Sequence, residues 1–561
     1  MEKKYSELTS DILKLMPQFK KAFLYSLASG LLTLAPIAYM REVYGPVLDS
    51  RSTETLIYVT VLLIFILLLD GVLENIRGKY LAIAALRLAE LKSIRIFNAI
   101  FKATLQNNPP GATQALSNLN TIKNFFKSTA MMGIMEAPSA LVFFILIFMI
   151  HPIMGIFSLT GAITMLLFGL LKERKVKPLI IESQRYSSIC YGFITDISKN
   201  AVTVQAMNMK EALRKKWYVY FESEILSQAK ASIEENSATT ITKIVMIAQG
   251  SILLALTLWL SLIGVLSPQV GAYMIIAKLL GAKAVQPILI LIKSMRQIEL
   301  ARESYDQLSQ FLEKMPIPPK KLELPKPIGH LIVQKASINA SNTKKVIVSD
   351  LNINLKPGRS LAIIGPSGSG KTSIAKMLAG VVKSSSGSVR LDGVDLYTWN
   401  KEEIGECIGF LPQEINLFEG SIKDNICRFS APDENKLEKV IQLLNLNDVI
   451  KKQAEGLDTI INDIGSNLSG GEKQKIGIAR AMYGTPCYVI LDEPDANLDE
   501  DGIQDIISMM VNIKNENTTL IMITHNPVFL SKVDQILMIE GGKPKLYGAS
   551  QKVIEHLNVK S

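Results

Sequence analysis

A glycine-rich octapeptide in the C-terminal half of the chain restricts that half to very few folds. It reads Gly365-Pro366-Ser367-Gly368-Ser369-Gly370-Lys371-Thr372, and it lies between the apolar run Leu361–Ile364 and a segment of helical spacing that begins at Ser373. A strand that is followed by such a loop and then by a helix forms a phosphate-binding site, because the backbone N–H groups of the loop and the helix dipole point toward the anion. Lys371 reaches the outer phosphates, and the Thr372 hydroxyl can bind Mg²⁺. The segment from Gly365 to Ser373 is therefore predicted to bind a nucleotide within an α/β domain.

A second buried-strand run ends in two carboxylates, Asp492 and Glu493, after Tyr488-Val489-Ile490-Leu491. Two acids at a strand end are costly unless a cation or a proton to be moved lies nearby. Asp492 is predicted to hold Mg²⁺ through water. Glu493 is predicted to be the general base that polarises the attacking water.

A third motif, Leu468-Ser469-Gly470-Gly471-Glu472, precedes a helical run and resembles the signature of the ATP-binding-cassette (ABC) family. The resemblance implies that Ser469, Gly470 and Gly471 of one subunit close over the ATP held by another, so that hydrolysis requires two cassettes. This chain carries one cassette. Each catalytic position holds the active residue type, which favours a homodimer.

The same resemblance assigns two further roles. Gln413, in Phe410-Leu411-Pro412-Gln413-Glu414, is expected to sense the γ-phosphate and Mg²⁺, and His525, after the run Leu520–Thr524, is expected to be the switch histidine. The predicted catalytic residues are Glu493, His525, Gln413 and Lys371. The predicted ligands of Mg²⁺ are Thr372, Gln413 and, through water, Asp492.

The N-terminal half is apolar enough to enter a membrane, and the mean hydropathy of the chain is +0.24. Apolar stretches form three pairs that are joined by turns at 41–54, at His151-Pro152 and at Ser267-Pro268, which predicts six membrane spans. The net charge of +10 is interpreted as loops that orient a membrane protein, and not as a nucleic-acid site, because Lys and Arg lie beside the spans. Their distribution predicts that both termini and the ATPase are cytoplasmic.

The prediction is thus a multidomain membrane protein. Residues 1–315 form an all-α transmembrane domain of six spans, a proline-containing linker covers 316–328, and an α/β P-loop domain covers 329–561. The spans are expected to continue as cytoplasmic helices, whose tips at 115–126 and 200–209 are candidate coupling helices. Four cysteines, Cys190, Cys407, Cys427 and Cys487, have neither zinc spacing nor a disulfide pattern, and are interpreted as reduced thiols.

Spans that precede a cassette in one polypeptide are the exporter arrangement, and the type I ABC exporter fold is expected. The chain resembles most the type I secretion ATPases of the protease and lipase exporter branch. This resemblance rests on stretches along the whole chain: Arg41–Leu48, Ala206–Met209, Leu411–Ile426 and Asp492–Asp499. The chain departs from that branch at Val202, where a glutamate is common, and at Asn208, where a glycine is common. It lacks an N-terminal cysteine-peptidase domain.

The resemblance to this branch implies ATP-driven export of an unfolded polypeptide across a bacterial inner membrane, with a periplasmic membrane-fusion adaptor and an outer-membrane channel as partners. Two alternative functions stay open, because neither the fold nor the ATPase domain determines what is transported. The chain could export lipid or small amphiphiles, or it could be an ATP-gated channel or regulator. The complete hydrolytic motifs count against the channel.

Two further features bear on specificity. The family usually places an adenine-stacking aromatic before the P-loop, but here the aligned residue is Ala340, and no Phe, Tyr or Trp occurs between Gly329 and Gly365. The secretion branch also tends to lack this aromatic. Lys278 and Lys283 lie mid-span, where a charge is tolerated mainly if it faces a cavity or a partner, so they are predicted to line the translocation path. Asp70, Glu74 and Glu136 are further candidates for that path.

Overall fold

The computed structural model describes residues 6–105, 114–265, 270–317, 324–340, 345–461 and 468–558. The chain divides between Pro316 and Ile317 into two compact units. Residues 318–323 of the predicted linker lie outside the described part, as does the predicted turn at Ser267-Pro268.

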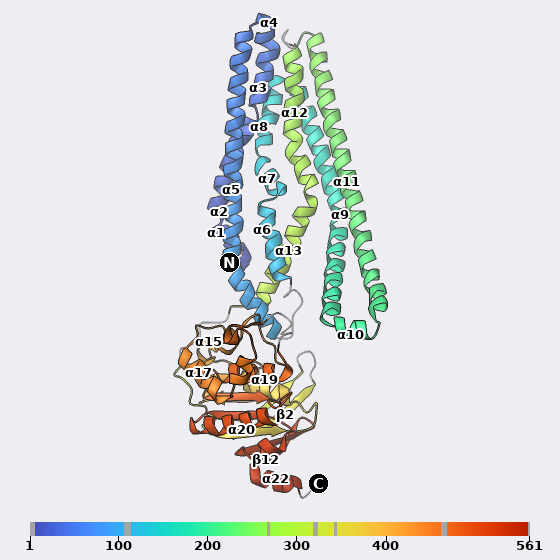
Figure 1. Ribbon diagram of the computed structural model, residues 1–561. Coiled ribbons are helices and arrows are strands. Elements are labelled where there is room, and N and C mark those ends of the chain that lie inside the picture. The colour runs from blue at the N-terminus through green and yellow to red at the C-terminus, as the bar shows by residue number, and fades with distance from the viewer. Residues whose placement is uncertain are drawn as a thin grey trace. The chain divides into compact units, whose positions relative to one another are not determined.

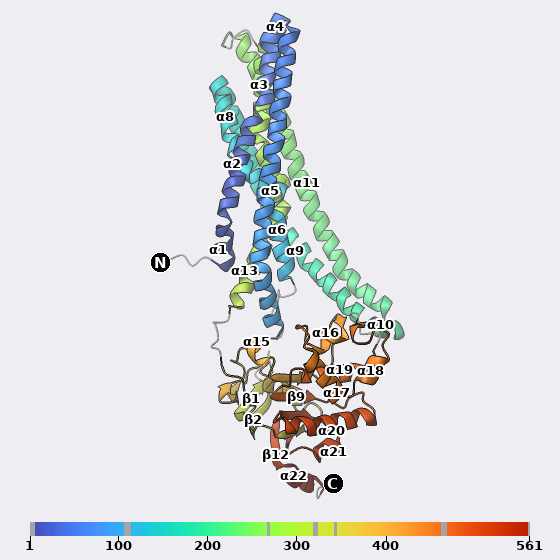
Figure 2. The same ribbon diagram turned by 60° about the vertical axis from the view of Figure 1, so that its left-hand side comes forward.

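The first unit is all-helical, and Figures 1 and 2 show its long helices running alongside one another. Its helices are α1 (Glu7–Lys14), α2 (Met16–Leu32), α3 (Ala35–Glu42), the π-helix η1 (Val43–Val47), α4 (Leu48–Ser50), α5 (Thr53–Leu105), α6 (Ala115–Phe126), α7 (Thr129–Glu136), α8 (Ser139–Ile150), α9 (Pro152–Lys199), α10 (Ala201–Ala206), α11 (Lys210–Leu262), α12 (Val270–Lys293) and α13 (Met295–Lys314).

Membrane-spanning capacity follows from the length and apolarity of these helices. Five helical segments of the described chain are long and apolar enough to cross a bilayer, and α7 with α8 makes a sixth if this pair, bent by 44°, is one span. The total then equals the six predicted spans. The 53 residues of α5 extend about 80 Å at 1.5 Å per residue, whereas the hydrocarbon core is about 30 Å thick. The long helices therefore continue well beyond a bilayer.

Helices occupy both predicted coupling segments. α6 covers 115–126, and α10 lies within 200–209, where it connects the ends of α9 and α11 (Figure 1).

The first turn is shorter than the turn predicted at 41–54. The chain stays helical through η1 and α4 to Ser50, and the turn begins at Arg51, whose φ of 52° ends the helix. Pro46 lies inside η1. A proline removes one backbone N–H donor from a helix. Because a single π-helical turn can absorb such an irregularity inside an α-helix, the helix continues past Pro46.

The second unit is an α/β domain that contains three sheets. The main sheet has the order β12-β11-β3-β10-β9-β6, with β12 antiparallel to β11 and the other pairs parallel, and the second sheet has the order β2-β1-β4-β5. The strands are β1 (Leu331–Asn339), β2 (Val346–Leu355), β3 (Ser360–Ile364), β4 (Ser386–Leu391), β5 (Val394–Asp395), β6 (Ile408–Leu411), β7 (Gly420–Ser421), β8 (Ile460–Ile461), β9 (Tyr488–Asp492), β10 (Thr519–Ile523), β11 (Gln535–Glu540) and β12 (Lys543–Ala549).

The helices of this unit lie between and after the strands. They are α14 (Lys371–Leu378), α15 (Lys401–Ile404), α16 (Ile422–Ile426), α17 (Glu434–Leu443), α18 (Asn447–Lys451), the 3₁₀ turn η2 (Gly456–Asp458), α19 (Gly470–Met482), α20 (Glu500–Asn515), α21 (Pro527–Leu530) and α22 (Ser550–Asn558).

The main sheet explains why the motifs follow apolar runs. Every residue of β3, β9 and β10 is buried, as expected for parallel strands that are covered on both faces. Carboxyl ends of parallel strands share one edge, which is where ligands bind in open α/β sheets. The P-loop follows β3, Asp492 ends β9, His525 follows β10 and Gln413 follows β6. The four predicted groups are thus collected at one edge of the sheet.

Candidate functional site: a nucleotide site at the sheet edge

Two glycines of the P-loop are required for two reasons: their backbones have positive φ angles, and neighbouring atoms lie too close for a side chain. A Cβ on Gly365, which has φ +155°, would lie 2.2 Å from the Ile539 carbonyl oxygen. A Cβ on Gly370, at φ +96°, would lie 2.6 Å from Val348 Cγ2. Both values are far inside van der Waals contact. The loop can therefore turn from β3 into α14 against the adjacent strands only with glycine at these positions.

Lys371 is held inside the loop to which it belongs. Its ammonium donates to the carbonyl oxygens of Gly365 at 2.7 Å and Pro366 at 3.1 Å, and the residue is 7% exposed. The side chain lies at the first residue of α14, where the helix dipole favours an anion. A phosphate at this helix end would meet a positive charge that is already placed beside it.

Asp492 is the buried acid of the site. The residue is 1% exposed, and neither carboxylate oxygen has a hydrogen-bond partner among the described residues. Burial raises the pKa of Asp492 above its usual range, with a smaller contribution from Glu493, while Thr372 and Lys371 act in the opposite direction. A buried carboxylate without partners is costly. Its surroundings therefore suit a hydrated cation.

Gln413 links the P-loop helix to the second acid. Thr372 Oγ1 donates to Gln413 Oε1 at 3.3 Å, and Gln413 Nε2 donates to Glu493 Oε2 at 3.1 Å. The Glu493 backbone has φ 50°, a conformation that side chains seldom adopt, and its N–H donates to the Ile523 carbonyl at 2.9 Å. Backbone strain of this kind is found mostly at functional sites. The structure thus brings Thr372, Gln413 and Glu493 into one chain of hydrogen bonds.

His525 follows β10, the strand that lies between β3 and β9 in the main sheet. The preceding Thr524 is fully buried, and its hydroxyl donates to Asp495 Oδ1 at 3.3 Å and accepts from the Asn526 N–H at 3.0 Å. These bonds fix the backbone on both sides of His525. The imidazole itself is exposed, and in the described chain it makes no hydrogen bond to Glu493.

The signature residues begin α19 and pack against the loop after β9. Ser469 caps the helix: its hydroxyl accepts from the Glu472 N–H at 3.3 Å, and the Glu472 carboxylate accepts from the Ser469 N–H at 2.9 Å. A Cβ on Gly471 would lie 2.9 Å from the Asn497 carbonyl oxygen. Among the described residues, no hydrogen bond or ion pair joins Ser469, Gly470 or Gly471 to the P-loop of the same chain.

Gln474 is a residue of this site that the sequence reasoning missed. It is 3% exposed on α19, and its amide donates to the carbonyl oxygens of Glu493 at 3.2 Å and Pro494 at 2.9 Å. The signature helix therefore holds the backbone of the predicted base. A polar residue on the buried face of α19, three residues after Gly471, was the available signal.

Ala340 follows β1 and is half-buried, with its N–H bonded to the Lys345 carbonyl at 2.9 Å. Residues 341–344 lie outside the described part. The segment therefore offers a methyl group at the position where an aromatic ring was expected to stack on adenine.

The two lysines of α12 occupy different surroundings. Lys283 is half-buried and lines a cavity of about 300 Å³ in the first unit, together with Glu74 and Glu136. Lys278 is exposed and is not part of that cavity. Arg77 is buried in the cavity wall and pairs with both glutamates.

Comparisons with known proteins agree with this architecture. Residues 348–496 match the model of the ABC transporter family, and residues 21–282 match that of the ABC transporter transmembrane region. The type I secretion system ATP-binding protein PrsD of Rhizobium meliloti (strain 1021) is 31% identical over 94% of this chain and 90% of its own length. The toxin RTX-III translocation ATP-binding protein of Actinobacillus pleuropneumoniae is 25% identical over 98% and 77%, respectively.

Two other comparisons support less, one because it covers a small part of the chain and the other because its sequence identity is low. The ATP-dependent lipid A-core flippase of Burkholderia pseudomallei (strain 1710b) is 32% identical, but over only 39% of this chain and 37% of its own length. A structure of a bacterial Atm1-family ABC exporter with ATP bound superposes with a TM-score of 0.81 at 18% identity, covering 97% of this chain and 96% of that one. At this identity the superposition establishes the fold alone.

Apolar spanning helices, a P-loop sheet and a signature helix in one polypeptide define an ATP hydrolase coupled to membrane transport. The chain belongs to the ABC transporter family, in the branch of the type I secretion ATP-binding proteins.

Proposed function

We propose that this chain hydrolyses ATP to export an unfolded polypeptide across the bacterial inner membrane, as the energising component of a type I secretion system. The observation that carries the proposal is the extent of the match to PrsD, which includes the membrane unit as well as the cassette. Cargo is handled in the membrane unit, so similarity there is informative. The match to the lipid A-core flippase covers a much smaller part of the chain.

At the ATP site we assign each side chain a role. The loop from Gly365 to Ser373 cradles the phosphates with its N–H groups, and Lys371 neutralises the outer ones. Glu493 accepts the proton of the attacking water, and His525 and Gln413 respond to the γ-phosphate. Support for Glu493 comes from the Gln413 amide, which orients its carboxylate. This set of groups favours a hydrolytic pump over an ATP-gated channel.

A magnesium ion fits the same site. The two unpartnered oxygens of Asp492, the Thr372 hydroxyl and the Gln413 amide oxygen are the hard oxygen ligands that Mg²⁺ prefers. We propose that Thr372 and Gln413 bind the ion directly and that Asp492 binds it through water. The ion would supply positive charge to the phosphate oxygens.

The working assembly that we propose is a homodimer. Ser469, Gly470 and Gly471 make no bond to the P-loop of their own chain in the described structure, and α19 presents its N-terminus, which favours an anion. A second copy would place these residues over the first copy's ATP. A periplasmic membrane-fusion adaptor and an outer-membrane channel complete the proposed conduit. Both termini and the ATPase face the cytoplasm in this arrangement.

The proposed route for cargo passes α12, with Lys283 in a cavity and Lys278 on an exposed face of the same helix. We assign α6 and α10 to the coupling of this route to the ATPase, since α10 is a short helix that connects the ends of α9 and α11, and α6 follows the long helix α5 in the chain.

Secretion in a reconstituted cell tests the function. We expect that cells which co-express the chain, its adaptor, its outer-membrane channel and a candidate protein with an intact C-terminus will release that protein into the medium. The Glu493→Gln variant, expressed at the same level, is the matched control and should abolish release. If no candidate is secreted while the purified protein moves labelled lipid across liposomes in a Glu493-dependent way, lipid export replaces polypeptide export.

Nucleotide choice gives a second test. We expect weak discrimination between ATP and GTP, because Ala340 cannot stack on a base, and an aromatic stack on a base contributes about 1 to 3 kcal/mol in single-strand binding. The measurement is KM for both nucleotides with the purified protein in lipid. Ala340→Tyr is the complementary variant and should shift the preference. A hundredfold preference for ATP in the unchanged protein would contradict this expectation, because it would require another group that reads adenine.

A further inference from the structure

The cavity in the first unit is bounded by α2, α5, α7, α8 and α12. Glycines in two of these helices allow neighbouring helices to pack close to them. A Cβ on Gly30 of α2 would lie 2.6 Å from Ser139 Cβ, and one on Gly133 of α7 would lie 2.7 Å from Ile290 Cγ2. A bend and a helical proline occur in the same region. α7 and α8 meet at 44°, and Pro287 lies within α12. Close contacts beside bent helices leave an interior space of about 300 Å³.

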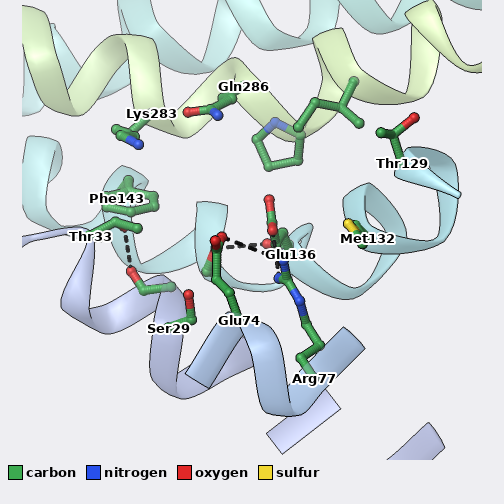
Figure 3. Close-up of a pocket in the computed structure, with 14 residues that line it drawn as sticks. Ser29, Thr33, Glu74, Arg77, Thr129, Met132, Glu136, Phe143, Lys283 and Gln286 are labelled. Carbon is green, nitrogen blue, oxygen red and sulfur yellow. Dashed lines mark hydrogen bonds and ion pairs between the residues drawn. The ribbon is translucent and has the colours of Figure 1, made fainter. Parts of the chain in front are cut away.

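One wall of this cavity is an ion-pair cluster around Arg77. The guanidinium is 4% exposed and lies 2.6 Å from Glu136 Oε1 and 3.5 Å from Glu74 Oε1, while Ser26 accepts from it at 3.3 Å. Figure 3 shows the side chains of Arg77, Glu74 and Glu136 meeting beneath α12. Each of the two cavity carboxylates therefore already has a cationic partner.

The opposite wall carries a charge without a partner. Lys283 extends from α12 near Gln286, on the other side of the cavity from the Arg77 cluster (Figure 3). In the described part of the chain it forms no ion pair and no hydrogen bond, and it is half-buried. An ammonium within a membrane helix is costly unless it faces water or a counter-charge. The four charges of the cavity sum to zero: the Arg77 cluster, in which Glu74 and Glu136 share one guanidinium, carries a net charge of −1, and Lys283 carries +1 without an ion-pair contact to either glutamate in the described structure.

From this separation we infer that the cavity binds a carboxylate of the transported chain, with Lys283 as its counter-charge and the Gln286 amide as a second donor. The inference rests on the proposed function and adds the chemistry by which cargo is held. A carboxylate meets the unpaired ammonium on one side, while Arg77 holds Glu74 and Glu136 on the other. The carboxylate can come from an acidic side chain or from the C-terminus of the cargo.

Three short fluorescent Gly/Ser peptides test this with the full-length protein in lipid nanodiscs. The first contains Asp and has an amidated C-terminus, the second contains Asn with a free C-terminus, and the third contains Asn with an amidated C-terminus. We expect one or both carboxylate peptides to bind about tenfold more tightly than the third, as one charge-assisted hydrogen bond predicts. Which of the two binds distinguishes the side chain from the C-terminus.

Variants on α12 locate the site. Lys283→Met should remove the preference for carboxylate, and Lys283→Arg should keep it. Lys293→Met is the matched control, because it removes an exposed lysine at the end of the same helix, away from the cavity lining, and should leave the preference intact. Thermal stability and basal ATPase rates of all variants report whether each is folded.

Several outcomes would overturn the inference. The first is equal binding of the three peptides, and the second is an equal loss of the preference in Lys293→Met and Lys283→Met. The third is tighter binding of a matched lysine-containing peptide, which would assign the cavity to cations. If secretion requires Glu493 while the carboxylate preference is absent, the proposed function stands and only this inference is removed.

Discussion

Glu493→Gln should lower the rate of ATP hydrolysis by about 10² to 10⁴-fold, which is the usual contribution of a general base. Glutamine keeps the shape of the side chain but cannot accept the proton of the attacking water. ATP binding should persist, because Lys371 and the P-loop are unchanged and Lys371 is anchored within that loop. The measurements are phosphate release and nucleotide binding by the purified protein in lipid, and we expect the variant dimer to be trapped closed.

Glu555→Gln provides the control for this change. It makes the same substitution at an exposed position of α22, far along the chain from the site, and should leave turnover unaffected. Turnover close to that of the unchanged protein in Glu493→Gln would falsify the assignment of Glu493 as the base, and a loss of ATP binding would point to a structural role instead.

Arg428→Met should lower the free energy of unfolding of the second unit by about 3 kcal/mol or more, because each carbonyl acceptor left without a donor costs about 1 to 3 kcal/mol. Arg428 donates to four backbone carbonyls, at 2.9 Å to Arg480, 3.0 Å to Ala481, 2.6 Å to Gly405 and 3.3 Å to Ile408. Two of these carbonyls belong to the last turn of α19, where a cation is favoured and the acceptors lack helical partners. Methionine would leave all four carbonyls without this donor.

The positive charge of Arg428 is partly removed from water, which is unfavourable for the charged form. Burial lowers the pKa of Arg428, and the neighbouring Arg480 adds to this effect. The guanidinium is tolerated because carbonyl oxygens surround it. Urea unfolding followed by hydrogen exchange in α19 measures the predicted loss, with the exposed Lys451→Met as the control. An unchanged exchange rate in α19 would show that these hydrogen bonds do not hold the helix end.

The sequence predicts the ATP site well because its chemistry is local. Strand, loop and helix follow one another around Lys371, and parallel pairing of β3, β10 and β9 then brings the ends of those strands to one edge. The six apolar stretches are likewise local signals, and they correspond to the apolar helices of the first unit.

Pairs formed between distant segments were not predictable in this way. Arg77 and Glu136 are 59 residues apart, and Arg77 reads from the sequence as one more cytoplasmic charge. Only the packing of α5 against α7 and α2 shows that it is buried between two acids. Gln474 and Arg428 bond to backbone carbonyls, which every residue carries, so their sequence contexts do not identify their partners.

Gln474 has a consequence for timing. It lies on α19, the helix that begins with the signature residues, and its amide donates a hydrogen bond to the backbone carbonyl of Glu493. In the proposed dimer, that helix touches the neighbour's nucleotide with one end while it steadies the catalytic carboxylate of its own chain with its first turns. Binding or release of ATP at one site of this dimer would therefore act on the catalytic carboxylate at the other site. We expect the two hydrolysis cycles of the dimer to be coupled.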